Sequence, residues 1–240
     1  MDPPSADARR FAPATERNRE PILAILDTVL PPSGTVLEIS SGTGEHAVFF
    51  APRLQRLRWQ PSELDPLLRD SILAWMRLFP AQNLLPPLDL DVRRSPWPIK
   101  MPDQKGQSLA EAITAIVNIN MIHIAPWEAC QALFSGAERV LPDGGIVYLY
   151  GPYKCRDYPT AASNLAFDQS LRDRNSAWGL RDLETVVALA QAHHLKLHQV
   201  IEMPANNLSV IFQNRIFQNR IFQKRDSLNK SNVLSYVSRF

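Results

Sequence analysis

The order of apolar and polar positions along the chain predicts strands that alternate with helices. Short apolar runs of strand length occur at 35–39, 113–119 and 146–150. The last two are apolar at nearly every position, which is typical of parallel strands covered on both faces. Further strands are expected at 57–61, 84–90, 195–203 and 208–212, the second of them interrupted by two prolines.

Stretches between these runs place apolar residues three and four positions apart, which predicts amphipathic helices. The clearest is 66–79, where Asp65 is a candidate N-cap and Pro66 occupies the favoured first helical position. The other expected helices are 46–54, 126–141, 161–174 and 181–193.

Strands that alternate with helices predict an α/β fold with a doubly wound, mostly parallel sheet. We expect this domain to span 31–213, preceded by an N-terminal lid segment at 1–30. Ligands of such sheets bind outside the carboxyl ends of the strands, so the residues that follow each strand are the candidates for function.

The C-terminal residues repeat a short motif instead of continuing this alternation. IFQNR occurs at Ile211–Arg215 and Ile216–Arg220, and IFQKR follows at Ile221–Arg225. A period of five matches neither a helix nor a strand, so no apolar face is maintained. We interpret 214–240 as a poorly ordered extension derived from a tandem duplication, with a partner-binding segment as the alternative.

Composition narrows the possible classes of protein. The chain has 240 residues, of which 45% are hydrophobic, enough for one large domain with a core. A net charge of +2 does not favour nucleic acid or a membrane as partner. Cys130 and Cys155 lack disulfide-framework or metal-site spacing, the N-terminus is polar, and no apolar run reaches membrane-spanning length. We therefore expect a cytoplasmic protein without a bound metal, and the oligomeric state stays open.

The segment VLEISSGTGEH, residues 36–46, has the pattern of a strand, a small glycine turn and the start of a helix. Gly42 and Gly44 lack Cβ, so the turn that they form with Ser40 and Thr43 allows a flat ligand to approach the main chain. The following helix N-terminus offers free N–H groups. This pattern indicates a nucleotide-cofactor site, although Ala47 replaces the third glycine of a dinucleotide fingerprint.

Three acidic residues stand at the ends of the first three predicted strands: Glu38, Glu63 and Asp91. A carboxylate before the glycine turn repels a pyrophosphate but suits the cationic S-adenosylmethionine. A carboxylate at the end of the second strand suits a ribose diol, and one at the end of the third suits the adenine amino group. Each acid alone is more typical of a solvated loop or a helix cap than of a ligand site, and it is their order and spacing together that favour S-adenosylmethionine over NAD.

Several segments between Arg10 and Phe212 carry a resemblance to a known family. The chain resembles the class I S-adenosylmethionine-dependent methyltransferases, and more narrowly the DUF938 family, also called UPF0585 or the methyltransferase-like 26 group. Besides VLEISSGTGEH, the matching segments are ATERNREPIL (14–23), WQPSELDP (59–66), NMIHIAPWEA (120–129), YGPYK (150–154), WGLRDLE (178–184) and MPANNL (203–208).

The resemblance implies a Rossmann-like sheet of seven strands, the last of them antiparallel. It also implies a position for each cofactor residue. Glu38 would hold the ammonium group of S-adenosylmethionine, Glu63 the ribose hydroxyls and Asp91 the adenine. The turn at Ser40, Gly42, Thr43 and Gly44 would pass beneath the ligand, and Asn118 or Asn120 would face its methionine portion. S-adenosylhomocysteine would be the product of the cofactor.

Candidates for catalysis and acceptor binding follow the fourth and fifth strands. His123 is the best candidate for a general base because imidazole titrates near neutral pH, and packing against the next helix is the alternative. Trp127 and Tyr153 could line a substrate or simply pack, while Tyr150 would shape the acceptor pocket.

Two residues of the N-terminal segment, Arg17 and Asn18, are candidates for a lid over the cofactor. Arg17 is equally consistent with a surface ion pair to Glu20.

Three functions remain open from the sequence. The first is an S-adenosylmethionine-dependent methyltransferase with a small-molecule acceptor, and the second is a catalytically silent regulatory protein that binds the same cofactor. The third, a nicotinamide oxidoreductase, is less favoured because Glu38 precedes the turn and Pro152 separates Tyr150 from Lys154. The chain has no basic stripe that would favour a nucleic-acid acceptor.

Overall fold

The computed structural model describes residues 7–99, 112–215 and 237–238. The chain forms two compact units, residues 1–119 and 120–240. The predicted alternation of strands and helices is present in both.

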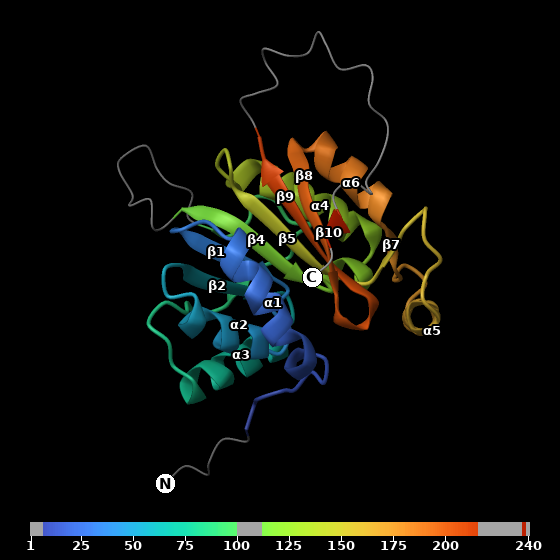
Figure 1. Ribbon diagram of the computed structural model, residues 1–240. Helices are drawn as coiled ribbons and strands as arrows, with labels where there is room; N and C mark the ends of the chain where they lie inside the picture. The colour runs from blue at the N-terminus through green and yellow to red at the C-terminus, as the bar shows by residue number, and fades with distance from the viewer. Residues whose placement is uncertain (1–6, 100–111, 216–236, 239–240) are drawn as a thin grey trace. The chain divides into compact units, whose positions relative to one another are not determined.

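The first unit is built on parallel strands. Its elements are α1 (Thr15–Val29), β1 (Thr35–Ile39), α2 (Glu45–Phe50), the 3-10 helix η1 (Ala51–Arg53), β2 (Arg58–Glu63), α3 (Pro66–Leu78), β3 (Leu88–Asp89) and β4 (Ile113–Ile119). Strand β1 pairs in parallel with both β2 and β4, and β3 pairs in parallel with β2. Helix α2 contacts both α1 and α3, and α3 lies against β2 (Figure 1).

Local sequence explains these elements. Every residue of β1 is buried, as expected for a central parallel strand. Asp65 caps α3 as predicted, because its side chain accepts a hydrogen bond from the Leu67 N–H at 2.8 Å. The strand expected at 84–90 is reduced to β3, because Pro86 and Pro87 cannot donate to a ladder.

The second unit places an antiparallel strand between two others. Its elements are η3 (Met121–His123), α4 (Trp127–Val140), β5 (Ile146–Gly151), β6 (Tyr153–Lys154), α5 (Ala162–Arg174), β7 (Arg181–Asp182), α6 (Leu183–Ala192), β8 (Leu195–Met203), η4 (Pro204–Asn206), β9 (Asn207–Asn214) and β10 (Val237–Ser238). Strand β9 pairs antiparallel with β5 and β8, and β10 pairs in parallel with β8 (Figure 1). Helix α6 packs on β8 and contacts α4.

In the first unit the strand order is β4-β1-β2-β3, and in the second it is β10-β8-β9-β5, with β6 and β7 as a separate two-stranded sheet. The last long strand, β9, is the antiparallel one. The predicted α/β class with a mostly parallel sheet and an antiparallel last strand is therefore confirmed. The two-residue strand β10 was not predicted.

One predicted helix begins later than expected. The pattern from residue 181 predicted helix, but Arg181 and Asp182 pair with Tyr153 and Lys154 as β7, and α6 starts at Leu183. The prediction was wrong there because a partner strand supplies the hydrogen bonds that local periodicity cannot anticipate.

The first copy of the repeated motif belongs to the sheet, since Ile211–Asn214 forms the end of β9. The following copies at 216–225, and with them most of the predicted poorly ordered extension, lie outside the described residues.

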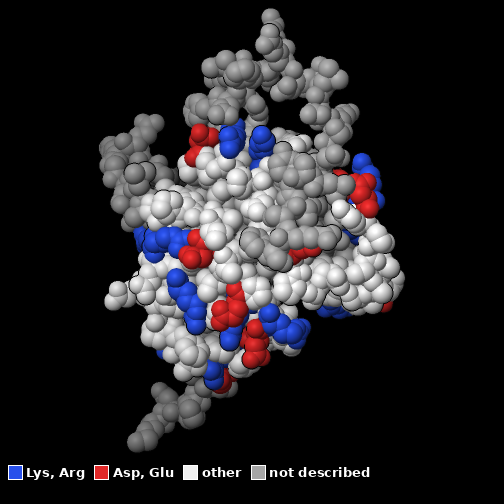
Figure 2. All heavy atoms as spheres, viewed as in Figure 1, with Lys and Arg blue, Asp and Glu red and all other residues white. Residues whose placement is uncertain are grey.

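The described surface carries charges of both signs. On the face drawn in Figure 2, Lys and Arg side chains are interspersed with Asp and Glu, and the coloured residues there form no single basic stripe. Among the described residues, no helix is both long enough and apolar enough to cross a membrane.

Candidate functional site

The glycine turn after β1 has two glycines with different surroundings. Gly44 has φ +92°, and a Cβ there would lie 2.8 Å from the Ile72 Cα, so this position needs glycine to pack against α3. Gly42 has φ +57°, and a Cβ there would meet nothing within 4 Å. Gly44 thus closes the turn onto the core, while Gly42 leaves open space above its main chain.

Glu63, at the end of β2, is joined to this turn. The Gly42 N–H donates to Glu63 Oε2 at 2.9 Å, and the Leu64 and Asp65 N–H groups donate to Oε1 at 2.8 and 3.2 Å. The side chain is 7% exposed. The second-strand acid and the glycine turn are therefore hydrogen-bonded neighbours in the fold, and their role as a cofactor site stays a prediction.

Glu38 lies in the same unit but is more deeply buried. Its Oε2 accepts a hydrogen bond from Trp59 Nε1 at 2.9 Å. Burial raises the pKa of the Glu38 carboxyl to about 7, although hydrogen bonds from Trp59 and Ser41 oppose the shift. Glu38 is therefore close to half ionised at neutral pH, so a neighbouring cation would change its protonation.

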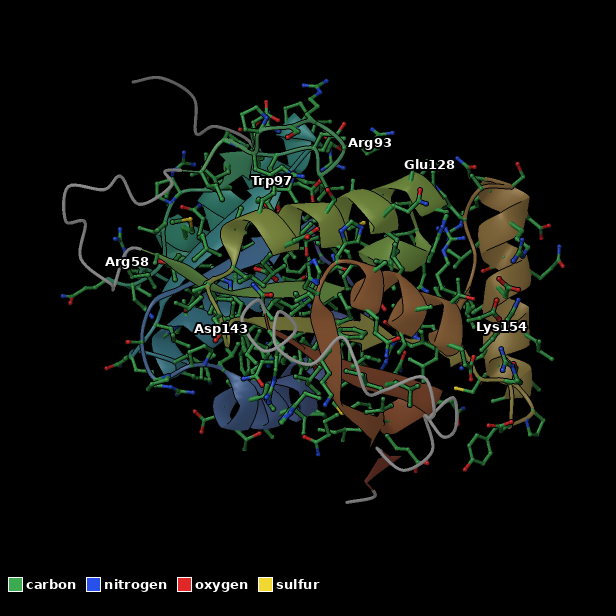
Figure 3. The ribbon with its side chains drawn as sticks, turned by 90° about the horizontal axis from the view of Figure 1, so that it is seen from above. Arg58, Arg93, Trp97, Glu128, Asp143 and Lys154 are labelled. Atoms are coloured by element: carbon green, nitrogen blue, oxygen red, sulfur yellow. The ribbon has the colours of Figure 1, made fainter. Side chains whose placement is uncertain are left out.

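Asp91, the third predicted acid, forms ion pairs with two arginine side chains. Its carboxylate accepts from Arg93 Nε at 3.0 Å and Nη2 at 2.9 Å, and Arg94 Nε lies 3.9 Å away. The hydrogen bond from the Arg93 side chain lowers the pKa of Asp91. Trp97 donates from Nε1 to the Val92 carbonyl at 3.0 Å, which closes the loop that carries Arg93 (Figure 3).

The N-terminal segment is tied to the helix that follows the glycine turn. The Ala12 N–H and Thr43 Oγ1 both donate to Glu45 Oε2, at 2.6 and 2.8 Å. His46 Nε2 lies 2.9 Å from Asn18 Oδ1, and burial lowers the pKa of His46 to about 4, so the ring is neutral. Of the two predicted lid residues, Asn18 is buried against this helix.

Arg17, the other predicted lid residue, is exposed on α1.

The two candidate asparagines after β4 have different environments. Asn118 is 1% exposed and donates from Nδ2 to the Ile39 carbonyl at 2.9 Å, while its Oδ1 has no hydrogen-bond partner among the described residues. Asn120 adopts φ +67°, and its N–H donates to the Tyr150 carbonyl at 2.8 Å. Asn118 Oδ1 is thus a buried acceptor available to a ligand.

His123 is fully buried rather than placed on an open rim. Its ring packs edge-on against Tyr153 with the ring centroids 5.0 Å apart, and neither ring nitrogen has a partner among the described residues. Burial, with the nearby Arg181 cation, lowers the pKa of His123 to about 3. This geometry supports the packing interpretation of His123, and its role as a base stays a prediction.

Arg181 is a residue that the sequence analysis did not single out. Its guanidinium donates to the Ile122 carbonyl at 2.9 Å and to the Ala125 carbonyl at 2.7 Å, and it lies over the Trp127 ring at 5.6 Å. The available signal in the sequence was the WGLRDLE motif, to which Arg181 belongs. In the structure, the Gly179 N–H of the same motif donates to the His123 carbonyl at 2.9 Å. The segments 178–184 and 120–129 are therefore neighbours in the fold.

The remaining candidates are less accessible than expected. Tyr150 is 3% exposed, Tyr153 is 5% exposed and Trp127 is half-buried. Within the described part of the chain, His, Cys, Asp and Glu side chains form no cluster suited to a metal ion.

Several solved structures with a similar fold are named as methyltransferases. An O-methyltransferase family protein from Burkholderia thailandensis superposes with a TM-score of 0.66 at 15% identity, covering 84% of this chain and 57% of its own. Human N-acetylserotonin methyltransferase in complex with S-adenosylmethionine gives 0.66 at 12% identity, covering 84% and 53%. An O-methyltransferase family 2 protein from Planctomyces limnophilus in complex with apigenin gives 0.67 at 15% identity, covering 88% and 62%.

The chain spans little more than half the length of these proteins, and at such low identity the likeness establishes the class I methyltransferase fold alone. A family model described as "Protein of unknown function (DUF938)" matches residues 9–214, most of the chain. This protein therefore belongs to the DUF938 family.

Proposed function

We propose that this protein is an S-adenosylmethionine-dependent methyltransferase that acts on a small molecule. The observation that carries the proposal is the hydrogen bond from the Gly42 N–H to Glu63 Oε2 at 2.9 Å, which unites the glycine turn with the second-strand carboxylate. A ribose-binding acid beside an open main-chain turn is what an adenosyl ligand requires.

The residues present fit the proposed cofactor. Glu63 would take the ribose hydroxyls. A carboxylate has about four acceptor sites, and three N–H groups donate to Glu63 here, so an acceptor site is left for the ribose. Asn118 Oδ1, buried without a partner among the described residues, would accept from a polar hydrogen of the methionine portion. The open space over Gly42 would admit the body of the ligand.

The acids at the other strand ends complete the proposed site. Glu38 would balance the positive charge of the ligand. Asp91 would accept from the adenine amino group while keeping its contact with Arg93.

S-adenosylmethionine supplies an electrophilic methyl group on a sulfonium centre when it is bound. The chain's own contribution would be positioning and exclusion of water, which supply most of the rate of an in-line transfer. A base is required only where the acceptor must lose a proton, and His123 is the sequence-based candidate for it.

Calorimetry with purified protein tests the proposal directly. We expect S-adenosylmethionine and S-adenosylhomocysteine to bind with micromolar affinity, and NAD to bind at least tenfold more weakly because Glu38 lies before the turn. Binding of NAD without binding of either adenosyl compound would contradict the proposal. Binding without transfer to any component of a metabolite extract, followed with methyl-labelled cofactor, would favour the silent regulatory protein instead.

The binding should depend on pH through Glu38. Its pKa of about 7 in the free protein means that a cationic ligand, which needs the ionised form, must displace a proton below that pH. The affinity should therefore fall roughly tenfold or more between pH 7.5 and 5.5 and be nearly constant above pH 8. Calorimetric titrations across this range measure it. Glu38→Gln is the control, and an equal slope in this variant would contradict the assignment.

A further inference from the structure

A pocket of about 290 Å³ lies in the second unit beside the carboxyl end of β5. Residues of β6, the 155–161 loop, the start of α5 and the β8–β9 turn line it. Ligands of parallel α/β sheets bind at this end of the strands. The pocket therefore has the expected location of a ligand site, and none of its residues takes part in the cofactor site proposed above.

One wall of the pocket is a fixed aromatic ring. Tyr153 lines it, is only 5% exposed, and is held by the edge-on contact with His123 at 5.0 Å. Met203 and Leu208 add apolar surface from the β8–β9 turn, and Tyr158 stands exposed beside them. A rigid aromatic wall with apolar neighbours favours a flat ligand, because little side-chain entropy is lost on binding.

Two asparagines of the lining, Asn164 and Asn207, present hydrogen-bond acceptors. Asn164 donates from Nδ2 to the Asn206 carbonyl at 2.9 Å, and Asn207 donates from Nδ2 to the Pro204 carbonyl at 2.9 Å. Each contact uses an amide donor, while the amide oxygens of Asn164 and Asn207 accept no hydrogen bond within the described part of the chain and are acceptors for a ligand. A ligand that donates a hydrogen bond is therefore favoured.

The charge of the lining excludes anions. The described lining contains no Lys, Arg or His, and its acidic or thiol side chains are Glu202 and Cys155. Burial raises the pKa of the Cys155 thiol to about 11, so the thiol is neutral. The described lining therefore offers an anion no cationic side chain, and Glu202 adds an acidic residue to it, which disfavours a negatively charged ligand.

We propose that this pocket binds a small aromatic alcohol or amine without negative charge, and that such molecules are the acceptor class of this protein. The volume, at the lower end of ligand pockets, suits one or two rings with short substituents. The acceptor role rests on the proposed function. In the transfer an O–CH3 or N–CH3 bond forms as the S–CH3 bond of the sulfonium breaks, the sulfur keeps the bonding electron pair, and the acceptor proton passes to water.

Methyl-labelled methionine gives a reporter inside the pocket. Met203 lines it, whereas Met76 lies on α3 in the other unit. In carbon-13 NMR of the full chain labelled at the methionine methyls, phenol should shift the Met203 signal with a dissociation constant of about 1 mM, the range of a seven-atom fragment. Benzoate has the same ring but carries a negatively charged carboxylate, and it should bind at least tenfold more weakly. The Met76 signal should not shift with either compound.

A pair of neighbouring alanines provides the matched variants. Ala161→Phe places a ring in the lining and should weaken the phenol response at least tenfold, while Ala162→Phe, exposed at the next position and outside the lining, should leave it unchanged. Equal responses to phenol and benzoate, or a phenol response that survives in Ala161→Phe, would overturn the proposal.

Calorimetry with S-adenosylmethionine on the same samples separates the two proposals. Cofactor binding without a phenol response rejects the pocket and leaves the proposed function standing. A phenol response without cofactor binding supports the pocket and rejects methyl transfer.

Discussion

Replacing Glu63 by alanine is expected to weaken S-adenosylmethionine binding by about 5- to 150-fold. This range corresponds to about 1–3 kcal/mol, the cost of an unmet hydrogen-bonding group in a buried site. The carboxylate is 7% exposed and anchored to the Gly42 N–H, so few water molecules can replace it. Calorimetric titration of Glu63→Ala against the unchanged protein measures the effect.

Two further variants separate binding from folding. Glu63→Gln keeps an acceptor oxygen but loses the charge and should fall between the two proteins. Glu20→Ala removes an exposed carboxylate of α1 and should bind normally. An unchanged affinity in Glu63→Ala, with a urea unfolding curve like that of the parent protein, would show that the ribose is bound elsewhere.

Asp168→Ala is expected to lower the free energy of unfolding by about 2–3 kcal/mol. The Asp168 carboxylate accepts from Lys154 Nζ at 2.6 Å, Arg172 Nε at 3.2 Å and the Leu180 N–H at 2.8 Å, and Lys154 lies beside α5 in Figure 3. Its loss leaves a buried N–H and a partly buried ammonium without their acceptor. The estimate stays below that of a fully buried ion pair, because the Lys154 and Arg172 side chains are 29% and 45% exposed.

Urea unfolding followed by circular dichroism measures this loss. Asp173→Ala, an exposed aspartate on the same helix, is the matched control and should change stability by less than about 0.5 kcal/mol. Burial raises the pKa of the Asp168 carboxyl, but the hydrogen bonds from Lys154, Leu180 and Arg172 outweigh burial and lower the pKa overall. The contribution of Asp168 to stability is therefore present at neutral pH and is lost as the pH falls below the ordinary value of 3.8. Equal losses in both variants would contradict the assigned role.

Elements with strong local signals could be predicted from the sequence. The capped helix α3 begins at Pro66 as expected, and β4 has the predicted bounds Ile113–Ile119. In both, the information lies within a few residues: a side chain that caps its own helix, and an apolar run that only a buried strand can accommodate. The order of acids at β1, β2 and β3 was readable for the same reason, since Glu38 and Glu63 lie within the last two residues of their strands and Asp91 lies two residues after β3.

Other features depend on residues far apart in the chain. That Glu63 holds the Gly42 N–H follows from the parallel pairing of β1 with β2, which no periodicity specifies. Arg181 was assigned to a helix by its pattern, yet its backbone pairs with β6 and its side chain holds carbonyl groups of the segment after β4. The burial of His123 likewise depends on packing against Tyr153 and cannot be read from its place after a strand.

The amino-acid pattern alone was sufficient for the α/β class, the glycine turn and the series of acidic strand ends, because short-range propensity and periodicity encode them. The tertiary structure was needed to show which carboxylates accept hydrogen bonds from backbone N–H groups, that His123 is buried, and where a pocket lies. Those properties arise from strand register and side-chain packing, and they are set by contacts between segments that are distant in the chain.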